Sequence, residues 1–382
     1  MLFRSQKIFI IGPAHPLRGG LASFNERMAL EFQKNGNNVC LYSFSLQYPS
    51  LLFPGKTQFS SEPPPEQLKI HSSINSINPF NWIKIGKQIN KSKPDIVIFR
   101  YWIPFMAPCL GTIARFIHKN GHTKILCIAD NILPHEKRFA DTILTKYFIK
   151  PIDGFITMSE KVKNDLLAFN SKKPVEQAIH PLYDNFGGLV SKNEARIKLD
   201  LDQDKKIILF FGFIRAYKGL DLLIEAMADE RINSNEYLLL IAGEFYQDKK
   251  PYLELINKLN VSDKIKIVDD FIPDSLVRFY CCAADVIVQP YKSATQSGVT
   301  PLAYHFEKPM IVTNVGGLPK MVIHGETGLI CEPHPTSIAH AILKYFEKGA
   351  THFIPSLLNE KDKFSWRNFA DKILSLANDI QK

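Results

Sequence analysis

The sequence predicts an α/β protein with two doubly wound, Rossmann-like domains, and three observations support this class. Short apolar runs alternate with helical patterns along the whole chain, which indicates parallel strands joined by helices. Some runs, such as residues 207–211, are apolar at every position, as expected of strands buried on both faces of a sheet. The length of 382 residues allows roughly two to three domains of about 150 residues each.

In the first half, strands are predicted at residues 7–12, 39–44, 68–73, 95–100, 124–130, 154–159 and 175–180. A helix is predicted between the first two strands, where apolar residues recur at helical spacing: Leu21, Phe24, Met28, Ala29 and Phe32. Gly36 follows and is expected to end this helix. The order strand, helix, strand predicts a parallel sheet with right-handed crossovers.

The second half repeats the scheme, with strands predicted at residues 206–212, 237–243, 264–269, 285–290, 310–314 and 328–331. Pro181, Gly187 and Gly188 precede a polar segment and indicate a boundary between the halves. We therefore expect one domain over residues 1–185 and a second over residues 186–365. Residues 366–382 are expected to form a last helix, because six residues share one helical face: Trp366, Phe369, Ala370, Ile373, Ala377 and Ile380.

The composition excludes several classes of protein. Apolar residues make up 45% and charged residues 22% of the chain, which indicates a globular rather than a disordered protein. No apolar run reaches the roughly 18 residues of a transmembrane helix, and the first ten residues show a strand pattern rather than a signal peptide. The six cysteines form no C-x-x-C pair, which argues against a zinc site. We expect a cytoplasmic protein in a reducing environment.

The net charge of +9 is unevenly distributed. Residues 1–185 contain 23 Lys and Arg against 13 Asp and Glu, whereas residues 186–382 contain 24 against 25. A basic half suggests an anionic partner, such as lipid headgroups, a phosphorylated substrate or nucleic acid. The alternative is an ordinary solvated surface. There is no repeat of aromatic and basic residues of the kind that binds single-stranded nucleic acid, so no nucleic-acid partner is expected.

Ligands of open parallel sheets bind beyond the carboxyl ends of the strands, so we examined the residues that follow each strand. Two such domains facing each other would place both ligand edges on one cleft. The strongest candidate is the segment 212–219, which begins with Gly212 and contains Arg215 and Lys218 just before a predicted helix. A guanidinium and an ammonium beside free helical N–H groups suit a diphosphate. The alternative is two solvated cations on a loop.

Two further loops are candidates for contacts with phosphate or sugar. Gly19 and Gly20 follow the first strand and give a flexible turn before a helix, although the G-x-G-x-x-G dinucleotide motif is absent. The segment 289–299 follows a strand and contains Gln296, Ser297, Gly298 and Val299, whose hydroxyl, amide and N–H groups suit a phosphate or a hexose. An ordinary turn and a helix-capping loop are the respective alternatives.

Three other strand ends contribute candidates. Asp130, His135 and Glu136 follow the strand at 124–130, and a His beside a Glu is able to act on a hydroxyl proton, unless both simply cap a helix. Glu244 and the segment 269–273, which includes Ile272, follow two strands of the second half and are candidates to flank a nucleotide. Gly316 and Gly317 form a further candidate turn.

Taken in order, these segments resemble glycosyltransferase family 4, whose members have the GT-B fold. The segment GFIRAYKGLDLLIEA at 212–226 is similar to the family's Arg/Lys diphosphate segment. LLIAGE at 239–244 and FIP at 271–273 resemble its nucleotide loops. The motifs NVGGLP and HGETGLI match its later pattern, and FSW at 364–366 with the last helix resembles the segment that crosses back to the first domain. The resemblance covers nearly the whole chain.

The sequence departs from the family at two places. The family usually has two Glu separated by seven residues near the donor sugar and ribose, but residues 294–302 here are ATQSGVTPL and contain no carboxylate. This resembles a subgroup with a PY-x-SATQSG loop, in which Gln296, Ser297 and the backbone after Gly298 would make those contacts. Asp130 stands where the family often has a His.

The resemblance implies a retaining glycosyltransferase that moves a hexose from a nucleotide-diphosphate-sugar to a saccharide or lipid-linked saccharide, in polysaccharide or glycolipid synthesis. Arg215, Lys218 and the N–H groups after Gly298 would stabilise the diphosphate leaving group. Asp130, His135 and Glu136 would face the transferred sugar or the acceptor. No cofactor or metal is expected, and peripheral contact with an anionic inner membrane surface is expected from the basic half. A nucleotide-sugar epimerase of the same fold and a catalytically silent subunit are the alternatives.

Overall fold

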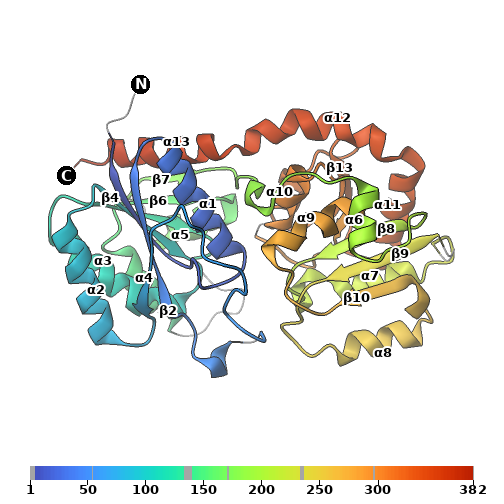
Figure 1. Ribbon diagram of the computed structural model, residues 1–382, viewed down its shortest axis with the longest axis horizontal. Helices are drawn as coiled ribbons and strands as arrows, with labels where there is room; N and C mark the ends of the chain where they lie inside the picture. Colours follow the sequence, from blue (N-terminus) through green and yellow to red (C-terminus); the bar gives the residue numbers. More distant parts are fainter. Residues whose placement is uncertain are drawn as a thin grey trace. The chain divides into compact units, whose positions relative to one another are not determined.

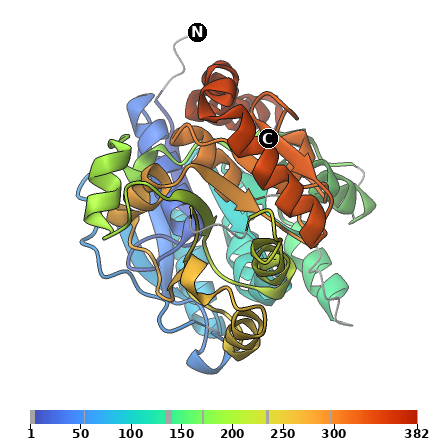
Figure 2. The same cartoon turned by 90° about the vertical axis from the view of Figure 1, so that its right-hand side faces the viewer.

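The computed structural model describes residues 5–53, 55–132, 140–169, 172–232, 236–295 and 297–381 (Figure 1). The chain divides into two compact units. Unit 1 comprises Met1–His180 together with Trp366–Lys382, and unit 2 comprises Pro181–Ser365. Each unit contains one parallel sheet with helices packed on its faces (Figure 1; Figure 2).

The sheet of unit 1 has seven strands in the order β3-β2-β1-β4-β5-β6-β7, and all neighbouring pairs are parallel. The seven predicted strands are all present, with ends that differ from the prediction by at most three residues. Their bounds are β1 Lys7–Ile11, β2 Asn38–Leu46, β3 Ile70–Asn75, β4 Ile96–Tyr101, β5 Lys124–Ala129, β6 Gly154–Thr157 and β7 Val175–Gln177.

Helices cover both faces of this sheet. The crossover through α1 (Gly20–Lys34) leads to one side of β1, and the crossovers through α2 (Pro79–Ser92), α3 (Ala107–His118) and α4 (Asp141–Ile149) lead to the other side. Right-handed crossovers in opposite directions place their helices on opposite faces. As predicted, α13 (Trp366–Asp379) returns to this unit and packs beside α1 (Figure 1). The described part of this unit also contains α5 (Glu160–Phe169).

The sheet of unit 2 has six strands in the order β10-β9-β8-β11-β12-β13, again all parallel. Their bounds are β8 Lys206–Phe211, β9 Tyr237–Ala242, β10 Ile265–Val268, β11 Val286–Gln289, β12 Met310–Thr313 and β13 Gly328–Cys331. The helices are α6 Lys192–Lys198, α7 Leu220–Met227, α8 Lys250–Lys258, α9 Asp274–Ala283, α10 Val299–His305, α11 Pro335–Lys348 and α12 Ala350–Lys361. The prediction of a doubly wound α/β architecture is therefore confirmed in both units.

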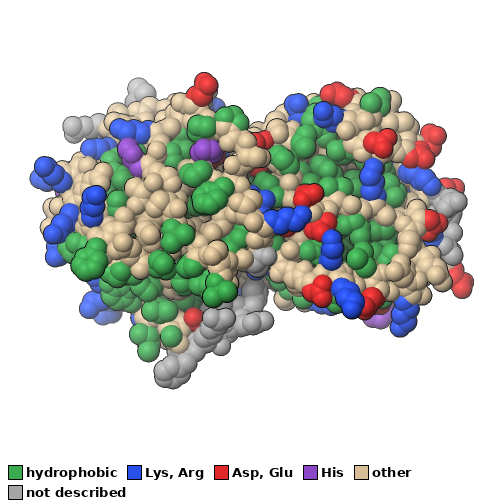
Figure 3. Space-filling model, turned by 60° about the horizontal axis from the view of Figure 1, so that its bottom comes forward, with side chains coloured by type: hydrophobic (Ala, Val, Ile, Leu, Met, Phe, Trp, Pro, Cys, Tyr) green, Lys and Arg blue, Asp and Glu red, His purple; other side chains and the backbone are tan. Residues whose placement is uncertain are grey.

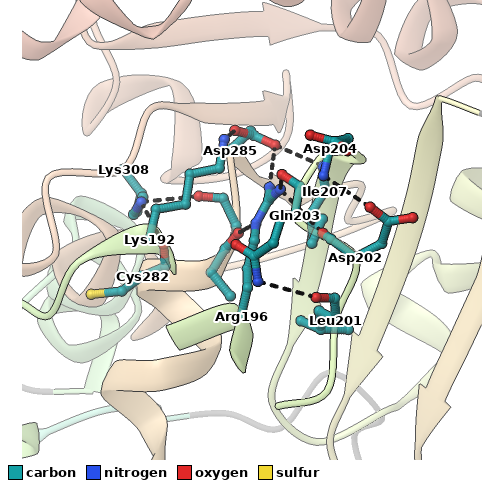
Figure 4. Close-up of polar contacts among 12 residues, drawn as sticks. Lys192, Arg196, Leu201, Asp202, Gln203, Asp204, Ile207, Cys282, Asp285 and Lys308 are labelled. Atoms are coloured by element: carbon teal, nitrogen blue, oxygen red, sulfur yellow. Dashed lines mark hydrogen bonds and ion pairs between the residues drawn. The ribbon is translucent and has the colours of Figure 1, made fainter. Parts of the chain in front are cut away.

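A buried polar network fixes the amino-terminal edge of the second sheet (Figure 4). The Arg196 side chain is fully buried and donates to the backbone oxygens of Ala283, Asp202 and Gln203. It also pairs with Asp285, which accepts a hydrogen bond from the N–H of Ile207 at the start of β8. These contacts join α6 to the sheet at the edge opposite the one where ligands are expected.

Candidate functional site

The strand order reverses beside β8 in unit 2, because the chain moves outward from β8 in both directions. Ligands of doubly wound sheets bind at the carboxyl ends of the strands at such a point. The loops that follow β8 and β11 are therefore the expected site, and they are the loops that contain the candidates Gly212, Arg215, Lys218 and 297–299.

Arg215 and Lys218 form a cationic pair on the loop after β8. The loop contains the single turn Ala216–Lys218 (η4) and leads into α7. The ammonium of Lys218 lies 3.3 Å from the position that a Cβ would occupy on Gly212. Burial, and then the neighbouring Arg215 guanidinium, lower the pKa of Lys218 to about 7. An anion bound here would offset both the cost of burying the Lys218 ammonium and its repulsion by Arg215. The pair is therefore suited to bind an anion.

Glycines allow the loops at this edge to approach one another closely. A Cβ on Gly219 would lie 2.0 Å from the carbonyl oxygen of Pro290, and a Cβ on Gly243 would lie 2.2 Å from that of Gly212. A Cβ on Gly316 would lie 1.5 Å from the carbonyl oxygen of Ala294. All three glycines also have positive φ angles. Only glycine fits these positions, which hold the loops after β8, β9, β11 and β12 together.

The loop before α10 is held by its own side chains. Ser297 is buried, its hydroxyl lies 3.2 Å from the Tyr291 hydroxyl, and it accepts a hydrogen bond from the N–H of Val299. The Val299 side chain lies 4.0 Å from the position that a Cβ would occupy on Gly212, so the start of α10 lies beside the cationic loop after β8. Gly298 directly precedes α10. Gln296 lies outside the described residues.

Three aromatic side chains stand beside the cationic pair. Phe213 follows β8, Tyr246 follows β9 and Phe271 follows β10, with ring centroids 4.3 Å apart for Phe213 and Tyr246 and 6.0 Å apart for Phe213 and Phe271. The Arg215 guanidinium lies 5.1 Å from the Tyr246 ring. This cluster is half-buried and offers aromatic surface next to positive charge.

The sequence analysis did not single out Phe213 or Tyr246. The signal that identifies them is an aromatic residue shortly after each of several neighbouring strands. The two nucleotide-side candidates Glu244 and Ile272 are both buried, and the backbone oxygen of Glu244 accepts a hydrogen bond from Ile214. Glu244 follows β9 and Ile272 follows β10, at the carboxyl ends of these strands.

In unit 1, Gly19 and Gly20 lie at the start of α1, directly after the loop that follows β1. Gly19 occupies the N-cap position with φ of 100°, and no side chain caps the helix there. The preceding loop is held in place, because the N–H of His15 donates to Glu26 and that of Arg18 to the backbone oxygen of Gln58. β1 is the strand at which the order of this sheet reverses.

Asp130 follows β5 and forms a buried ion pair with Arg100 on β4. The guanidinium donates from Nε to Oδ2 over 2.6 Å and from Nη2 to Oδ1 over 2.5 Å. Burial raises the pKa of the Asp130 carboxyl, and the Arg100 charge acts in the opposite direction. Arg100 was not among the candidates, because nothing local to the predicted strand at 95–100 indicates that this cation is buried and paired with Asp130. His135 and Glu136 lie outside the described residues.

The described part of the chain contains neither a candidate metal site nor a candidate membrane span. No group of three or more His, Cys, Asp or Glu in these residues is arranged to hold a metal ion. No helix in the described ranges combines the length and the apolar character of a membrane span. The structure thus brings together Gly212, Arg215, Lys218 and Val299 in unit 2, and separately places Gly19, Gly20 and Asp130 at strand ends of unit 1.

The fold defines the class. HepE of Anabaena in complex with UDP has a TM-score of 0.74 at 14% identity, covering 97% of this chain and 99% of that one. Sucrose-phosphate synthase of Thermosynechococcus elongatus has a TM-score of 0.72 at 16% identity, covering 98% of both chains. At these identities the likeness concerns the fold, and it confirms that the chain has the GT-B fold.

Most of unit 2 matches a known family in sequence. Residues 191–355 match the family described as Glycosyl transferases group 1, which confirms the resemblance to GT-B glycosyltransferases. A D-inositol 3-phosphate glycosyltransferase of Corynebacterium glutamicum is 29% identical over 193 residues, which are 48% of this chain and 46% of that protein. An uncharacterized glycosyltransferase of Methanocaldococcus jannaschii is 30% identical over 58% of each chain. The chain thus spans about half the length of the curated relatives it matches.

Proposed function

We propose that the protein is a retaining glycosyltransferase that moves a hexose from a nucleotide-diphosphate-sugar to a saccharide or lipid-linked saccharide acceptor. The observation that carries this proposal is the cationic pair Arg215 and Lys218 at the carboxyl end of β8, in a segment of the glycosyl transferases group 1 family. The role that fits the pair is to bind the donor diphosphate.

The pair would act on the leaving group. Breaking the bond between sugar and diphosphate gives an oxocarbenium-like sugar and leaves negative charge on the terminal phosphate. Fixed cations stabilise that charge as it develops. The lowered pKa of Lys218 supports this role, because the ammonium gains stability when an anion arrives. We propose that these two side chains, rather than a divalent metal, balance the charge.

The aromatic cluster of Phe213, Tyr246 and Phe271 is the proposed surface for the nucleobase. Its rings lie beside Arg215, and a diphosphate held by Arg215 would carry its nucleoside toward them. The solved structures of HepE contain UDP and UDP-glucose, which makes uridine nucleotides the first to be tested. Glu244 follows β9, as Tyr246 does, and Ile272 follows β10, as Phe271 does. Both are buried and would help to hold the aromatic cluster in position.

The acceptor would bind at unit 1. Gly19 and Gly20 leave the start of α1 without bulky side chains, and Asp130, His135 and Glu136 follow β5 in the sequence. The proposed acceptor is a saccharide of a polysaccharide or glycolipid pathway. The basic charge of residues 1–185 supports the proposal that the protein binds this acceptor at an anionic membrane surface.

The proposal is tested by thermal unfolding with UDP, GDP and ADP and their hexose conjugates. A ligand that binds the native state raises the unfolding temperature by mass action. We expect a rise with one diphosphate, and its loss in the Arg215→Ala, Lys218→Ala double variant. The matched control is Lys258→Ala, Lys348→Ala, which removes two exposed lysines from helices of the same unit.

Turnover with the donor so identified, and the anomeric configuration of the product, then test transfer and retention. Absence of any shift in folded protein would contradict the donor site. Binding without turnover would instead favour a catalytically silent subunit, a second candidate that the carboxylate-free segment 294–302 supports.

A further inference from the structure

One surface of unit 1 combines exposed apolar side chains with lysines. Leu51 and Leu52 are 94% and 57% exposed on the turn Ser50–Leu52 (η1), and Phe80 is 84% exposed in the first turn of α2. Ile77, just before α2, is also exposed. Single exposed apolar residues need no explanation, but a group of four large ones does. Figure 3 shows hydrophobic side chains gathered on a face of unit 1, with Lys and Arg along its outer margin.

The backbone brings these residues to the same edge of the sheet. η1 follows β2 and α2 follows β3, and the two strands are parallel neighbours. The N–H of Ser76 donates to the carbonyl oxygen of Leu46, which joins the two strand ends. The two leucines and Phe80 therefore project from adjacent connections.

Both connections are held in place, so the exposure of these side chains is part of the fold. The amide of Gln58 bonds both the N–H and the carbonyl oxygen of Tyr48, and the Tyr48 hydroxyl accepts a hydrogen bond from Trp102 over 2.7 Å. Tyr48 also stacks on Phe53, directly after η1. The side chain of Asn78 caps α2 by accepting from the N–H groups of Phe80 and Asn81.

A stripe of lysines continues from Phe80 along α2. Lys84, Lys87 and Lys91 follow Phe80 at spacings of four, three and four residues, which places all four on one face of the helix. The opposite face is buried through Ile85, Gly86 and Ile89. The whole stretch of residues 67–94 contains no Asp or Glu and five lysines: Lys69, Lys84, Lys87, Lys91 and Lys93.

We propose that this basic-apolar surface, formed by Leu51, Leu52, Ile77, Phe80, Lys84, Lys87 and Lys91, docks unit 1 on an anionic lipid bilayer. The apolar side chains enter the boundary between headgroups and acyl chains, and the lysines meet the phosphates of anionic lipids. A second copy of the chain fits this surface poorly, because a two-fold contact would place the lysine stripes against each other.

This inference rests on the proposed function, which includes contact with an anionic membrane, and it assigns that contact to named residues. Its test measures lipid binding and not turnover, so the failure of one proposal is distinguishable from the failure of the other. The full chain is sedimented with vesicles of phosphatidylcholine alone and of phosphatidylcholine with phosphatidylglycerol, at low and at high salt.

We expect the wild type to bind the anionic vesicles and to be released by salt. Binding should fall roughly tenfold or more in the Lys84→Gln, Lys87→Gln, Lys91→Gln variant and in the Leu51→Ser, Leu52→Ser variant. Two control variants remove the same groups from exposed positions of unit 2, namely Lys250→Gln, Lys258→Gln, Lys348→Gln and Leu253→Ser, Leu358→Ser. Both controls should bind as the wild type does.

A label tests insertion directly. All six native cysteines are buried, so a thiol introduced by Phe80→Cys takes an environment-sensitive dye selectively. Its emission should shift to the blue on anionic vesicles, whereas the same dye at Leu253→Cys should not shift. Absence of wild-type binding at low salt would overturn the proposal, as would surface variants that bind like the wild type. A dimer that the leucine variant dissociates, with lipid binding unchanged, would also overturn it.

Discussion

Arg100 and Asp130 form a bidentate ion pair inside unit 1, and the guanidinium lies 4.0 Å from the centre of the Phe24 ring. The pair therefore ties the ends of β4 and β5 to α1, which carries Phe24. Phe24 also contacts Trp366 on α13 and His180 at the end of this part of the chain. Both oxygens of Asp130 are bonded to Arg100, so the carboxylate is fixed in position at the strand end.

Replacing Arg100 by Met should lower the free energy of unfolding by about 3 kcal/mol or more, because it leaves a buried carboxylate without its partner. An unpaired buried Asp130 has a folded-state pKa above its unfolded value, so the folded variant takes up a proton that the unfolded chain does not. The stability deficit should therefore shrink as the pH falls toward the acid range. Urea unfolding at several pH values measures both effects.

The control for this prediction is Lys161→Met, which breaks the exposed pair with Asp165 in the same unit. Exposed pairs contribute between about 0 and 1 kcal/mol, so this variant should stay close to the wild type. Adding Asp130→Leu to Arg100→Met should recover part of the loss, because the second change removes the unpaired charge. A deficit in Arg100→Met that is the same at all pH values would contradict the account of an unpaired carboxylate.

The affinity for a nucleoside diphosphate should depend on the ionisation of Lys218. Its pKa of about 7 in the free protein means that the ammonium is largely lost above neutral pH. A bound diphosphate favours the charged form, so binding takes up a proton there, and the affinity should fall by up to about tenfold per pH unit as the pH rises above 7. Calorimetry with UDP well above the phosphate pKa of about 6 isolates this effect from titration of the ligand.

The variant Lys218→Met serves as the control for pH. It should bind UDP more weakly than the wild type, but with an affinity that no longer changes over this pH range. A wild-type affinity that is constant between neutral and alkaline pH would contradict the account in which an ammonium that is lost near neutral pH binds the diphosphate.

Substitutions at two glycines of unit 2 allow the cost of backbone strain to be measured apart from the cost of steric overlap. Gly316 and Gly325 both have positive φ angles, of 55° and 85°. A Cβ on Gly316 would overlap the backbone of Ala294, whereas a Cβ on Gly325 would have no neighbour within 4 Å. Gly325→Ala should cost about 1 kcal/mol of stability from strain alone. Gly316→Ala should cost roughly 3 kcal/mol or more, because the loop before α10 must also move.

Thermal and urea unfolding of both variants provide the measurement. Gly316→Ala should in addition weaken nucleotide binding, since the displaced loop leads into α10, whose first residue Val299 lies beside the Gly212 turn. Equal losses in the two variants would mean that the loops after β11 and β12 adjust freely, which would contradict a tight contact between Gly316 and Ala294.

The sequence predicted the fold well because the central strands of the two sheets, such as β4, β11 and β12, are buried on both faces. The run at residues 207–211, for example, has no polar face and ends at Gly212, so its position along the chain is unambiguous. The rule that ligands bind at the carboxyl ends of strands then selected the loop with Arg215 and Lys218. Both inferences need only local patterns and a general property of parallel sheets.

The contacts between loops could not be predicted in the same way. Nothing local to Gly316 indicates that it lies against Ala294, because that approach depends on β11 and β12 being neighbours. Arg100 was missed for the same reason, since its partner Asp130 is thirty residues away and is placed by the pairing of β4 with β5. The surface around Leu51 and Phe80 likewise becomes visible only when β2 and β3 are placed side by side.

The network around Asp285 gives a last prediction, for the stability of unit 2 (Figure 4). Asp285 pairs with two cations: Arg196, which is fully buried, and Lys192, whose side chain is 46% exposed. Removing the buried partner leaves three backbone oxygens without their donor and takes one of two cations from the Asp285 carboxylate, so Arg196→Met should cost about 3 kcal/mol or more. Lys192→Met removes a solvated partner of the same carboxylate and should cost less than about 1 kcal/mol. Urea unfolding of both variants measures the difference, and equal effects would mean that the charge of Asp285, rather than the burial of Arg196, sets the strength of the network.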